Sequence, residues 1–213
     1  GVTRLAFTPQ LILHTDANTY TSGAIWNDLS GNGNHMTLVN NYAKDATYGG
    51  NIKFTNGSAN VNFPSIDSKY FTLIFWIKMD VLTNYNQMIL LGISSDTSLY
   101  WGNFLHHSSS TGHIYAGTAS TTANRFEING IYNTTSPKMI AFTFANGVMN
   151  LYVNGILTSS KTVGNPTSAT LSKILFGVDT LNAKLGRVLL FNYPQVQSEI
   201  TTEFNNNKTR FGL

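Results

Sequence analysis

The stretch KMIAFTFANGVMNLYVNGILTSS, residues 138–160, decides the fold class of this chain. Apolar and other residues alternate up to Asn146-Gly147, and they alternate again up to Asn154-Gly155. An alternation with a period of two indicates a β-strand with one buried face. Asn-Gly supplies the two positive-φ residues of a type I′ turn, whose twist matches that of the paired strands. Residues 138–160 therefore predict two consecutive β-hairpins.

A second stretch, YFTLIFWIKM at residues 70–79, predicts a central strand. One face of this strand carries the apolar residues Phe71, Leu73, Phe75, Ile77 and Met79. The other face carries Ile74 and Trp76. Because both faces bear large apolar side chains, we expect both to be covered.

Shorter apolar alternations separated by turn residues predict further strands along the chain. They cover residues 11–14, 51–54, 60–63, 88–93, 99–104, 113–118, 173–176 and 185–192. After Pro194, the residues Val196, Ile200 and Phe204 are spaced four apart, which predicts one short helix. We therefore expect an all-β fold, a two-sheet antiparallel β-sandwich or jelly roll, with one short C-terminal helix.

The composition fits a globular protein, and we expect residues 1–213 to form a single domain of a longer polypeptide. Charged residues make up only 11% of the chain, so neutral hydroxyl and amide side chains must cover its surface. The net charge is +3, but the thirteen Lys and Arg are scattered singly, which argues against nucleic-acid binding. The chain has no cysteine, and no apolar run reaches membrane-spanning length, so we expect neither disulfides nor a membrane span.

The loop WNDLSGNGNHMTL, residues 26–38, raises the question of a cation site. Asp28, Ser30 and Asn32 occupy the first, third and fifth positions of a calcium loop of the EF-hand type. The twelfth position, which requires a bidentate glutamate, is Val39. The loop also lacks the lysine and the third glycine of a phosphate-binding loop. Calcium and other cofactors are therefore not supported by this loop.

A structural turn explains the same loop better. Asn and Gly accept left-handed backbone angles, and Asp and Ser side chains bond their own backbone. Trp26 and Leu38 anchor the two ends in the core. We expect the loop to fasten one edge of the sandwich, with at most a minor place at a binding rim.

Catalysis is not expected. Glycoside hydrolysis needs two carboxylates about 5–10 Å apart across a cleft. The ten acidic residues are dispersed, and only Glu199 and Glu203 are four apart, on the predicted helix, where a solvated face is expected. No Gly-x-Ser-x-Gly motif is present. We assign no catalytic residue.

The stretch SLYWGNFLHHSSSTGHIYAG, residues 98–117, is the candidate ligand-binding segment. Flat rings stack on sugar faces, and amides and imidazoles bond hydroxyl groups. The candidate residues are Tyr100, Trp101, Asn103, His106, His107, His113 and Tyr115. Trp101 or Tyr115 alone is equally well explained as part of the core. Adjacent residues on an extended chain point to opposite faces, so His106 and His107 do not predict a metal site.

Several of these stretches together resemble the laminin-G-like branch of the concanavalin A-like lectin/glucanase superfamily. The resemblance rests on LILHTDANTY (11–20), WNDLSGNGNHMTL (26–38), YFTLIFWIKM (70–79), NLYVNGIL (150–157) and LGRVLLFNYPQVQSEI (185–200). The tail NNNKTRFGL, residues 205–213, is similar to the end of laminin-G-like domains in structural proteins of tailed phages and other viruses. Two departures stand out. The acidic strand of family hydrolases has no counterpart, and Arg187 stands where relatives often carry an acid, which disfavours calcium there.

The resemblance implies a non-catalytic, lectin-like domain on a virion surface, as a head decoration, fibre or tail module with a role in host attachment. Its partners would be glycans or neighbouring capsid or tail proteins, with display in multiple copies on a larger assembly. One alternative is a secreted or cell-surface carbohydrate-binding module attached to an enzyme. A second alternative is a glycoside hydrolase with an unrecognised acid pair.

Overall fold

The structure is a computed structural model that describes residues 8–81, 86–92, 104–108, 113–117, 125–128, 135–162 and 170–213. Side chains are described for residues 8–81, 135–162, 170–177 and 181–213. The strands are β1 (Leu11–Asp16), β2 (Ile25–Trp26), β3 (Met36–Val39), β4 (Tyr42–Asp45), β5 (Asn51–Asp67), β6 (Tyr70–Met79), β7 (Asn86–Gly92), β8 (Phe104–Ser108), β9 (His113–Gly117), β10 (Arg125–Ile128), β11 (Lys138–Ala145), β12 (Val148–Val153), β13 (Ile156–Thr162) and β14 (Thr170–Phe191). A 3-10 turn η1 (Thr47–Gly49) and the helix α1 (Gln197–Asn207) complete the described elements. The predicted all-β class with one C-terminal helix is confirmed.

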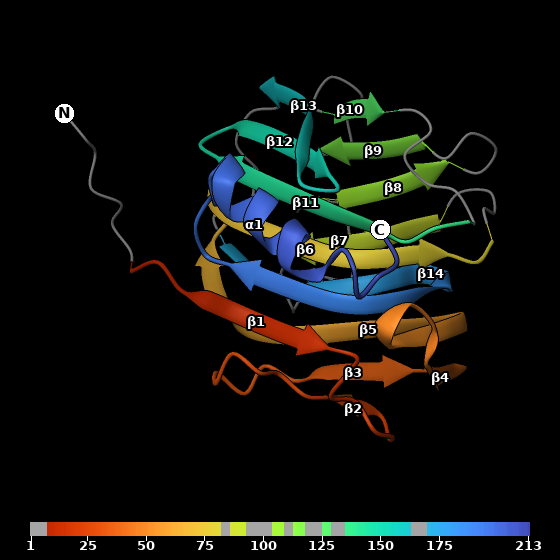
Figure 1. Ribbon diagram of the computed structural model, residues 1–213. Helices are drawn as coiled ribbons and strands as arrows, with labels where there is room; N and C mark the ends of the chain where they lie inside the picture. Colours follow the sequence, from red (N-terminus) through yellow and green to blue (C-terminus); the bar gives the residue numbers. More distant parts are fainter. Residues whose placement is uncertain are drawn as a thin grey trace.

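The strands form two facing layers (Figure 1). One layer has β13, β12, β11, β6 and the second half of β14 in order, with β1 at its edge; the other has β10, β9, β8, β7 and the first half of β14, followed by β5, β3 and β4. Every described pairing is antiparallel. The two layers are parts of one 14-stranded sheet because β14 and β5 run through both. Backbone hydrogen bonds along β14 and β5 therefore connect the two layers, which also pack against each other.

A glycine makes the bend of β14 between the layers. Its residues 173–176 pair with β7, whereas residues 183–191 pair with β6. The register against β5 shifts between Phe176 and Leu181, and Gly177 has a φ of +74°. A Cβ at Gly177 would lie 2.8 Å from the carbonyl oxygen of Gly57. Any other residue at position 177 would strain the crossing from one layer to the other.

The main core lies between the two layers. Phe75 of β6 meets Phe176 of β14 edge to face, with ring centroids 5.7 Å apart. Phe71 stacks on Phe144 of β11 at the same centroid distance, 5.7 Å. These rings come from the alternating positions that the sequence predicts to be inward, so the inner face of β6 is confirmed.

The outer face of β6 is covered by α1 and the chain after it, as Figure 1 shows. Ile74 and Trp76 are buried there, and Trp76 stacks on Phe211 with centroids 4.3 Å apart and on Phe204 at 5.8 Å. Ile200 of α1 is fully buried. The helix prediction is confirmed with one difference: Val196 precedes the helix and is 59% exposed, because its position caps the first turn.

The hairpins at residues 138–160 are confirmed in their turns. Asn146 and Gly147 have φ values of 45° and 87°, and Asn154 and Gly155 have 51° and 78°. Other predicted boundaries differ. The stretches 51–54 and 60–63 belong to one strand, β5, and the stretches 173–176 and 185–192 belong to β14 except for residue 192. The short strands β2, β3, β4 and β10 were not predicted, because each is too short to show a clear alternation.

Candidate functional site

The loop at residues 26–38 closes the open edge of β1. Asp28 accepts hydrogen bonds from the backbone N–H groups of His14, Ser30 and Asn34 at 2.9, 2.9 and 3.0 Å. The Leu29 N–H donates to the carbonyl oxygen of His14 at 2.6 Å. These bonds occupy backbone groups of a strand that pairs with β14 on its other side. Covering an edge strand in this way protects it from pairing with another chain.

Two amides of the loop continue the cover. The side-chain NH2 of Asn34 donates to the carbonyl oxygen of Ile12 at 2.8 Å, and that of Asn32 donates to the carbonyl oxygen of Leu11 at 2.7 Å. Gly31 and Gly33 have positive φ values, and the anchors Trp26 and Leu38 are buried. The interpretation of the loop as a turn that fastens a sheet edge is confirmed.

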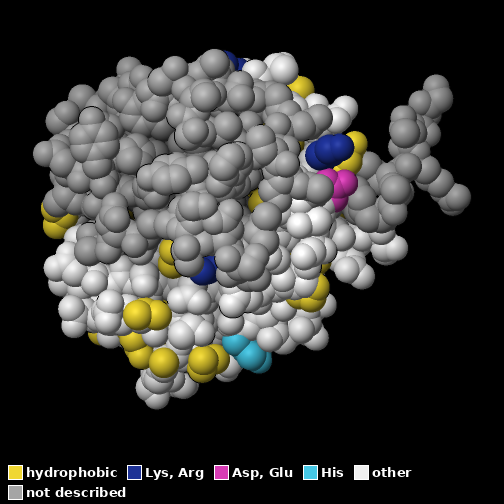
Figure 2. All heavy atoms as spheres, turned by 180° about the vertical axis from the view of Figure 1, so that it is seen from behind, with side chains coloured by type: hydrophobic (Ala, Val, Ile, Leu, Met, Phe, Trp, Pro, Cys, Tyr) yellow, Lys and Arg dark blue, Asp and Glu magenta, His cyan; other side chains and the backbone are white. Residues whose placement is uncertain are grey.

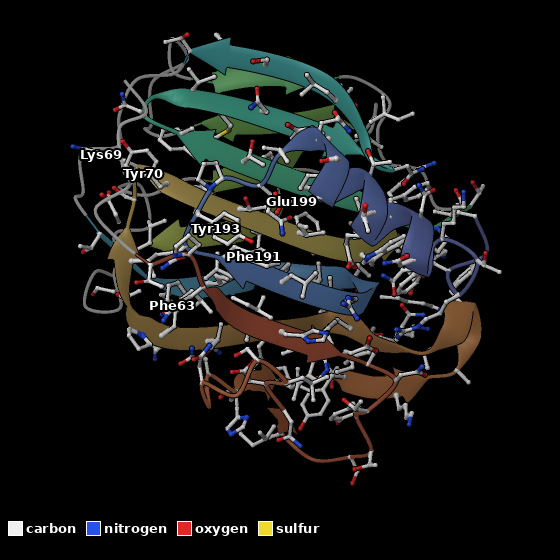
Figure 3. All side chains as sticks on the ribbon, turned by 60° about the vertical axis from the view of Figure 1, so that its left-hand side comes forward. Phe63, Lys69, Tyr70, Phe191, Tyr193 and Glu199 are labelled. Atoms are coloured by element: carbon white, nitrogen blue, oxygen red, sulfur yellow. The ribbon has the colours of Figure 1, made fainter. Side chains whose placement is uncertain are left out.

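The same loop also forms one wall of a groove of about 300 Å³, which we call the amide groove. Its lining residues are Gln10, Ile12, Asn32, Asn34, Pro64, Ser65, Ile66, Asp67 and Asn192. They come from the loop at residues 26–38, from Gln10 and the start of β1, from the end of β5 and from the residue after β14. Figure 3 brings this end of the sandwich forward, with Phe63 beside the β5 part of the groove and with Phe191 and Tyr193 on either side of position 192.

The groove combines an apolar floor with fixed polar groups. Ile12 and Ile66 are buried, whereas Gln10, Asn32 and Asp67 are exposed. The Asn192 Oδ1 accepts the backbone N–H of Gln10 at 2.7 Å, and Asp67 Oδ1 accepts the Lys69 N–H at 2.9 Å. An apolar surface with a few preset hydrogen-bonding groups is the usual form of a small-ligand site.

A second cluster of polar groups lies on the outer face beside α1, and we call its four residues the ionic clasp. Arg210 forms two bonds of 2.7 Å to the carboxylate of Asp16. Arg187 lies 3.1 Å from Asp16 Oδ2 and 3.0 Å from Glu203 Oε1. Two cations therefore balance two carboxylates, and the clasp joins β1, β14 and the C-terminal segment. This balance leaves no net negative charge for calcium, in line with the expectation drawn from Arg187.

Burial and pairing set the pKa values in the ionic clasp. Burial raises the pKa of Asp16, but the hydrogen bonds from Arg210, Asn18 and Arg187 outweigh it and hold that pKa below its usual value. For Glu203 burial prevails over Arg187, so its pKa is raised. The expectation of a solvated helix face was wrong for Glu203, because its side chain is only 15% exposed.

The pair Glu199 and Glu203 was the closest approach to a catalytic acid pair in the sequence. Glu199 Oε2 accepts the N–H of Val196 at 2.8 Å and so caps α1. Glu203 bonds Arg187, Trp76 Nε1 at 3.4 Å and the Asn207 side chain at 3.0 Å. Both carboxylates line a groove of about 300 Å³ beside α1, but both are held in structural contacts. Among the residues with described side chains, no three His, Asp or Glu gather to hold a metal.

The structure describes only some of the predicted ligand-binding residues. Tyr100, Trp101 and Asn103 lie outside the described residues. His106 and His107 belong to β8, and His113 and Tyr115 belong to β9. These two strands pair with each other, with His106 opposite Tyr115. Both strands continue the β7 side of the sheet and pair with neither β1 nor β5, so the described part of this segment is a candidate separate from the amide groove.

Sequence reasoning missed Gln10, Ser65, Asp67 and Asn192 as groove residues. Their positions in the chain are up to 182 residues apart, as in the hydrogen bond between Gln10 and Asn192. A signal existed in the loop itself, where Asn32 and Asn34 stand beside the glycines. The rest of the groove needed the pairing of β1 with β14, which no local pattern gives.

The comparisons with known proteins place the fold. A laminin-G family model, described as the concanavalin A-like lectin/glucanases superfamily, matches residues 50–201. The chain belongs to this superfamily. The resemblance drawn from the sequence motifs is thereby confirmed at the level of the superfamily. The search among curated protein sequences gave no match to this chain.

Solved structures with the same fold include binding domains of botulinum neurotoxins. The serotype D binding domain has 16% identity and a TM-score of 0.73 over 92% of this chain and 52% of its own. The DC binding domain, solved with rat synaptotagmin II, has 17% identity and a TM-score of 0.70 over 92% and 51%. The serotype D ligand-binding domain, solved with N-acetylneuraminic acid, has 17% identity and a TM-score of 0.72 over 92% and 51%. This chain therefore spans about half the length of these neighbours, and the likeness shows a shared fold.

Proposed function

We propose that this chain is a non-catalytic carbohydrate-binding domain that binds a glycan in the amide groove. The observation that carries the proposal is the groove itself, where amides and a carboxylate surround the apolar floor of Ile12, Pro64 and Ile66. Sugars present the same two features, hydroxyl groups at the rim and C–H groups on the ring faces. The groove is preformed because Asn32, Asn34 and Asn192 are each held by hydrogen bonds to backbone groups.

Two further observations support a binding role without catalysis. The superfamily includes lectins, and two neighbours were solved in complex with N-acetylneuraminic acid and with rat synaptotagmin II. The carboxylates of Glu199 and Glu203 serve as a helix cap and as an ion-pair partner, so neither is arranged as a free acid or nucleophile. A fold shared with binding domains fits this arrangement, although fold alone does not assign a function.

The location that we propose is the surface of a virion, on a head, fibre or tail protein. The tail sequence of residues 205–213 supports this location through its similarity to viral laminin-G-like domains. A neutral surface supports it as well: on the face in Figure 2, few of the described side chains are charged. Display in many copies would compensate for weak single sites, because linked sites raise the effective concentration of ligand.

A glycan array of the purified chain tests the binding role. Binding to at least one glycan, weakened in Gln10→Ala and retained in Asn205→Ala, is expected. Asn205 is the matched control because it is an exposed amide on the α1 side of the molecule, away from the amide groove. Absence of binding to any glycan, or equal loss in both variants, would contradict the proposal.

Antibody labelling of particles by negative-stain electron microscopy tests the location. Labelling at the head, fibres or tail of intact virions is expected. Recovery of the protein in soluble host fractions alone would contradict a virion location and would favour the secreted carbohydrate-binding module. Turnover of a polysaccharide that disappears when one acid is replaced would contradict the non-catalytic role.

A further inference from the structure

We infer that the amide groove selects a neutral terminal sugar and rejects a sialylated one. This inference rests on the proposed carbohydrate-binding function and adds the class of ligand. It is argued from the charge and the size of the groove. The selectivity can therefore fail in an experiment in which carbohydrate binding itself is found.

The charge of the groove is one-sided. Among the nine lining residues in the described part of the chain, Asp67 is the one charged side chain, and the others are neutral amides, a serine and apolar residues. A sugar carboxylate placed beside Asp67 would meet a like charge, and the lining residues that the structure describes include no Lys or Arg to pair with it. Two like charges about 4 Å apart in water weaken binding by roughly fivefold, and by more where water is excluded.

Lys69 does not supply the missing cation within the groove. Its backbone N–H, rather than its ammonium group, bonds Asp67. Its side chain is exposed and projects outward from the turn between β5 and β6 (Figure 3). The contact between Lys69 and Asp67 therefore fixes the carboxylate as an acceptor without neutralising it by an ion pair.

The chemistry of the lining matches a neutral sugar ring. A carboxylate accepts hydrogen bonds from hydroxyl groups, and amides both donate and accept them. Asp67 stands at one side of the groove, and Gln10 and Asn192 supply amides from the other elements. Neighbouring hydroxyls of one sugar ring can bond both kinds of group while the ring rests on Ile12 and Ile66.

The size of the groove favours the end of a glycan. Its volume of about 300 Å³ is at the lower limit of small-ligand pockets, which reach about 1,000 Å³. Such a space holds one or two sugar rings rather than a long chain. A terminal sialic acid would cap the neutral ring that fits and would carry its charge toward Asp67.

The test is titration calorimetry with matched glycan pairs that differ only in a terminal N-acetylneuraminic acid. The neutral core is taken from the glycans bound on the array. We expect the neutral member to bind at least about fivefold more tightly, and we expect Asp67→Asn to narrow this ratio. The variant keeps the size of the side chain and removes its charge. An unchanged urea midpoint verifies that the variant folds as the parent does.

The outcomes separate the two proposals. Equal or tighter binding of the sialylated member overturns the selectivity while leaving carbohydrate binding intact. A ratio that Asp67→Asn leaves unchanged overturns the assignment of the selectivity to this carboxylate. Absence of binding to every member of the pairs overturns the proposed function, and the selectivity with it.

Discussion

The amide groove and the ionic clasp use similar polar groups for opposite purposes. In the clasp, charged side chains bond one another, as Arg210 and Arg187 do with Asp16, and little of them is exposed. At the groove, side chains bond the backbone through one group and lie at the surface beside an apolar floor. A carboxylate paired with two cations stabilises the fold, whereas an exposed carboxylate such as Asp67 remains available to a ligand. The partner of a polar group, rather than its type, therefore decides whether the group stabilises the fold or remains available to a ligand.

The largest expected effect is on the packing behind the clasp. Phe211 is fully buried against Trp76, and its ring would lie within 2.2 Å of a Cβ at Gly186. Phe211→Ala should lower the free energy of unfolding by about 3–5 kcal/mol, because it opens a cavity under the C-terminal segment. Urea unfolding measures the change. Leu213→Ala, at a position that is 36% exposed, is the control and should cost less than about 0.5 kcal/mol.

The next effect is on the clasp itself. Asp16→Ala should cost about 3 kcal/mol, because it leaves the guanidinium groups of Arg187 and Arg210 without their shared carboxylate. Because the pKa of Asp16 is lowered in the folded state, its contribution is complete above about pH 3.8 and is lost as the pH falls through the folded pKa. Urea unfolding from pH 7 to pH 2 measures both effects. A variant as stable as the parent at pH 7 would contradict the account of the clasp.

A smaller loss of stability is expected at the loop of residues 26–38. Asp28→Ala removes the acceptor of three backbone N–H groups and should cost about 2 kcal/mol. The same change should also weaken glycan binding, because Asn32 and Asn34 are held in place by the loop. Asp28→Asn keeps one acceptor oxygen and should lose less of both. An Asp28→Ala variant with full glycan affinity would show that the loop does not contribute to the glycan-binding site.

Protonation of His14 should make the folded state acid-sensitive. Burial and then Arg187 lower its pKa below 6.5, against the opposing effects of Asp16 and Asp28. The folded state therefore binds this proton more weakly than the unfolded state, so stability falls as the pH drops below about 6.5 and stops falling below the folded pKa. In His14→Gln, the urea midpoint should change less between pH 7 and pH 5 than it does in the parent. An unchanged slope in this variant would assign the effect to another group.

The smallest effect on stability and a large effect on binding are expected at one residue. Gln10→Ala shortens an exposed side chain. The backbone N–H of residue 10, which donates to Asn192, is retained in the variant. Its free energy of unfolding, measured with urea, should stay within about 0.5 kcal/mol of the parent value. Its affinity for a bound glycan should fall by about tenfold, the cost of one hydrogen-bonding group. Loss of stability with unchanged affinity would place Gln10 with the scaffold.

The sequence predicted the local parts of the fold well. The Asn-Gly turns, the two-sided strand at residues 70–79 and the helix spacing each depend on neighbours within a few residues, so a single stretch encodes them. The continuous strands β5 and β14 were divided because Asn56 and Gly177 adopt positive φ values in their middle, which reads locally as a turn. The bend of β14 became visible only with its partners β6 and β7 in place.

The sites were less predictable than the fold. The loop at residues 26–38 reads as a turn, and it is one, but its role as a groove wall depends on residues 64–67 and Asn192. The helix spacing predicts a solvated Glu203, yet its side chain pairs with Arg187 of β14 and is largely buried. Polar side chains take their roles from distant partners, and such partners leave no pattern in a single sequence. The prediction for residues 100–115 stays a prediction.

The most direct test is NMR chemical-shift mapping of the labelled protein during titration with a neutral glycan that binds on the array. The account predicts saturable shifts that cluster at the amide groove, at the side-chain amides of Gln10, Asn34 and Asn192 and at the backbone of Asp67. Shifts confined to the segment from Tyr100 to Tyr115, with the groove unchanged, would contradict it and would return the site to the residues first predicted from the sequence.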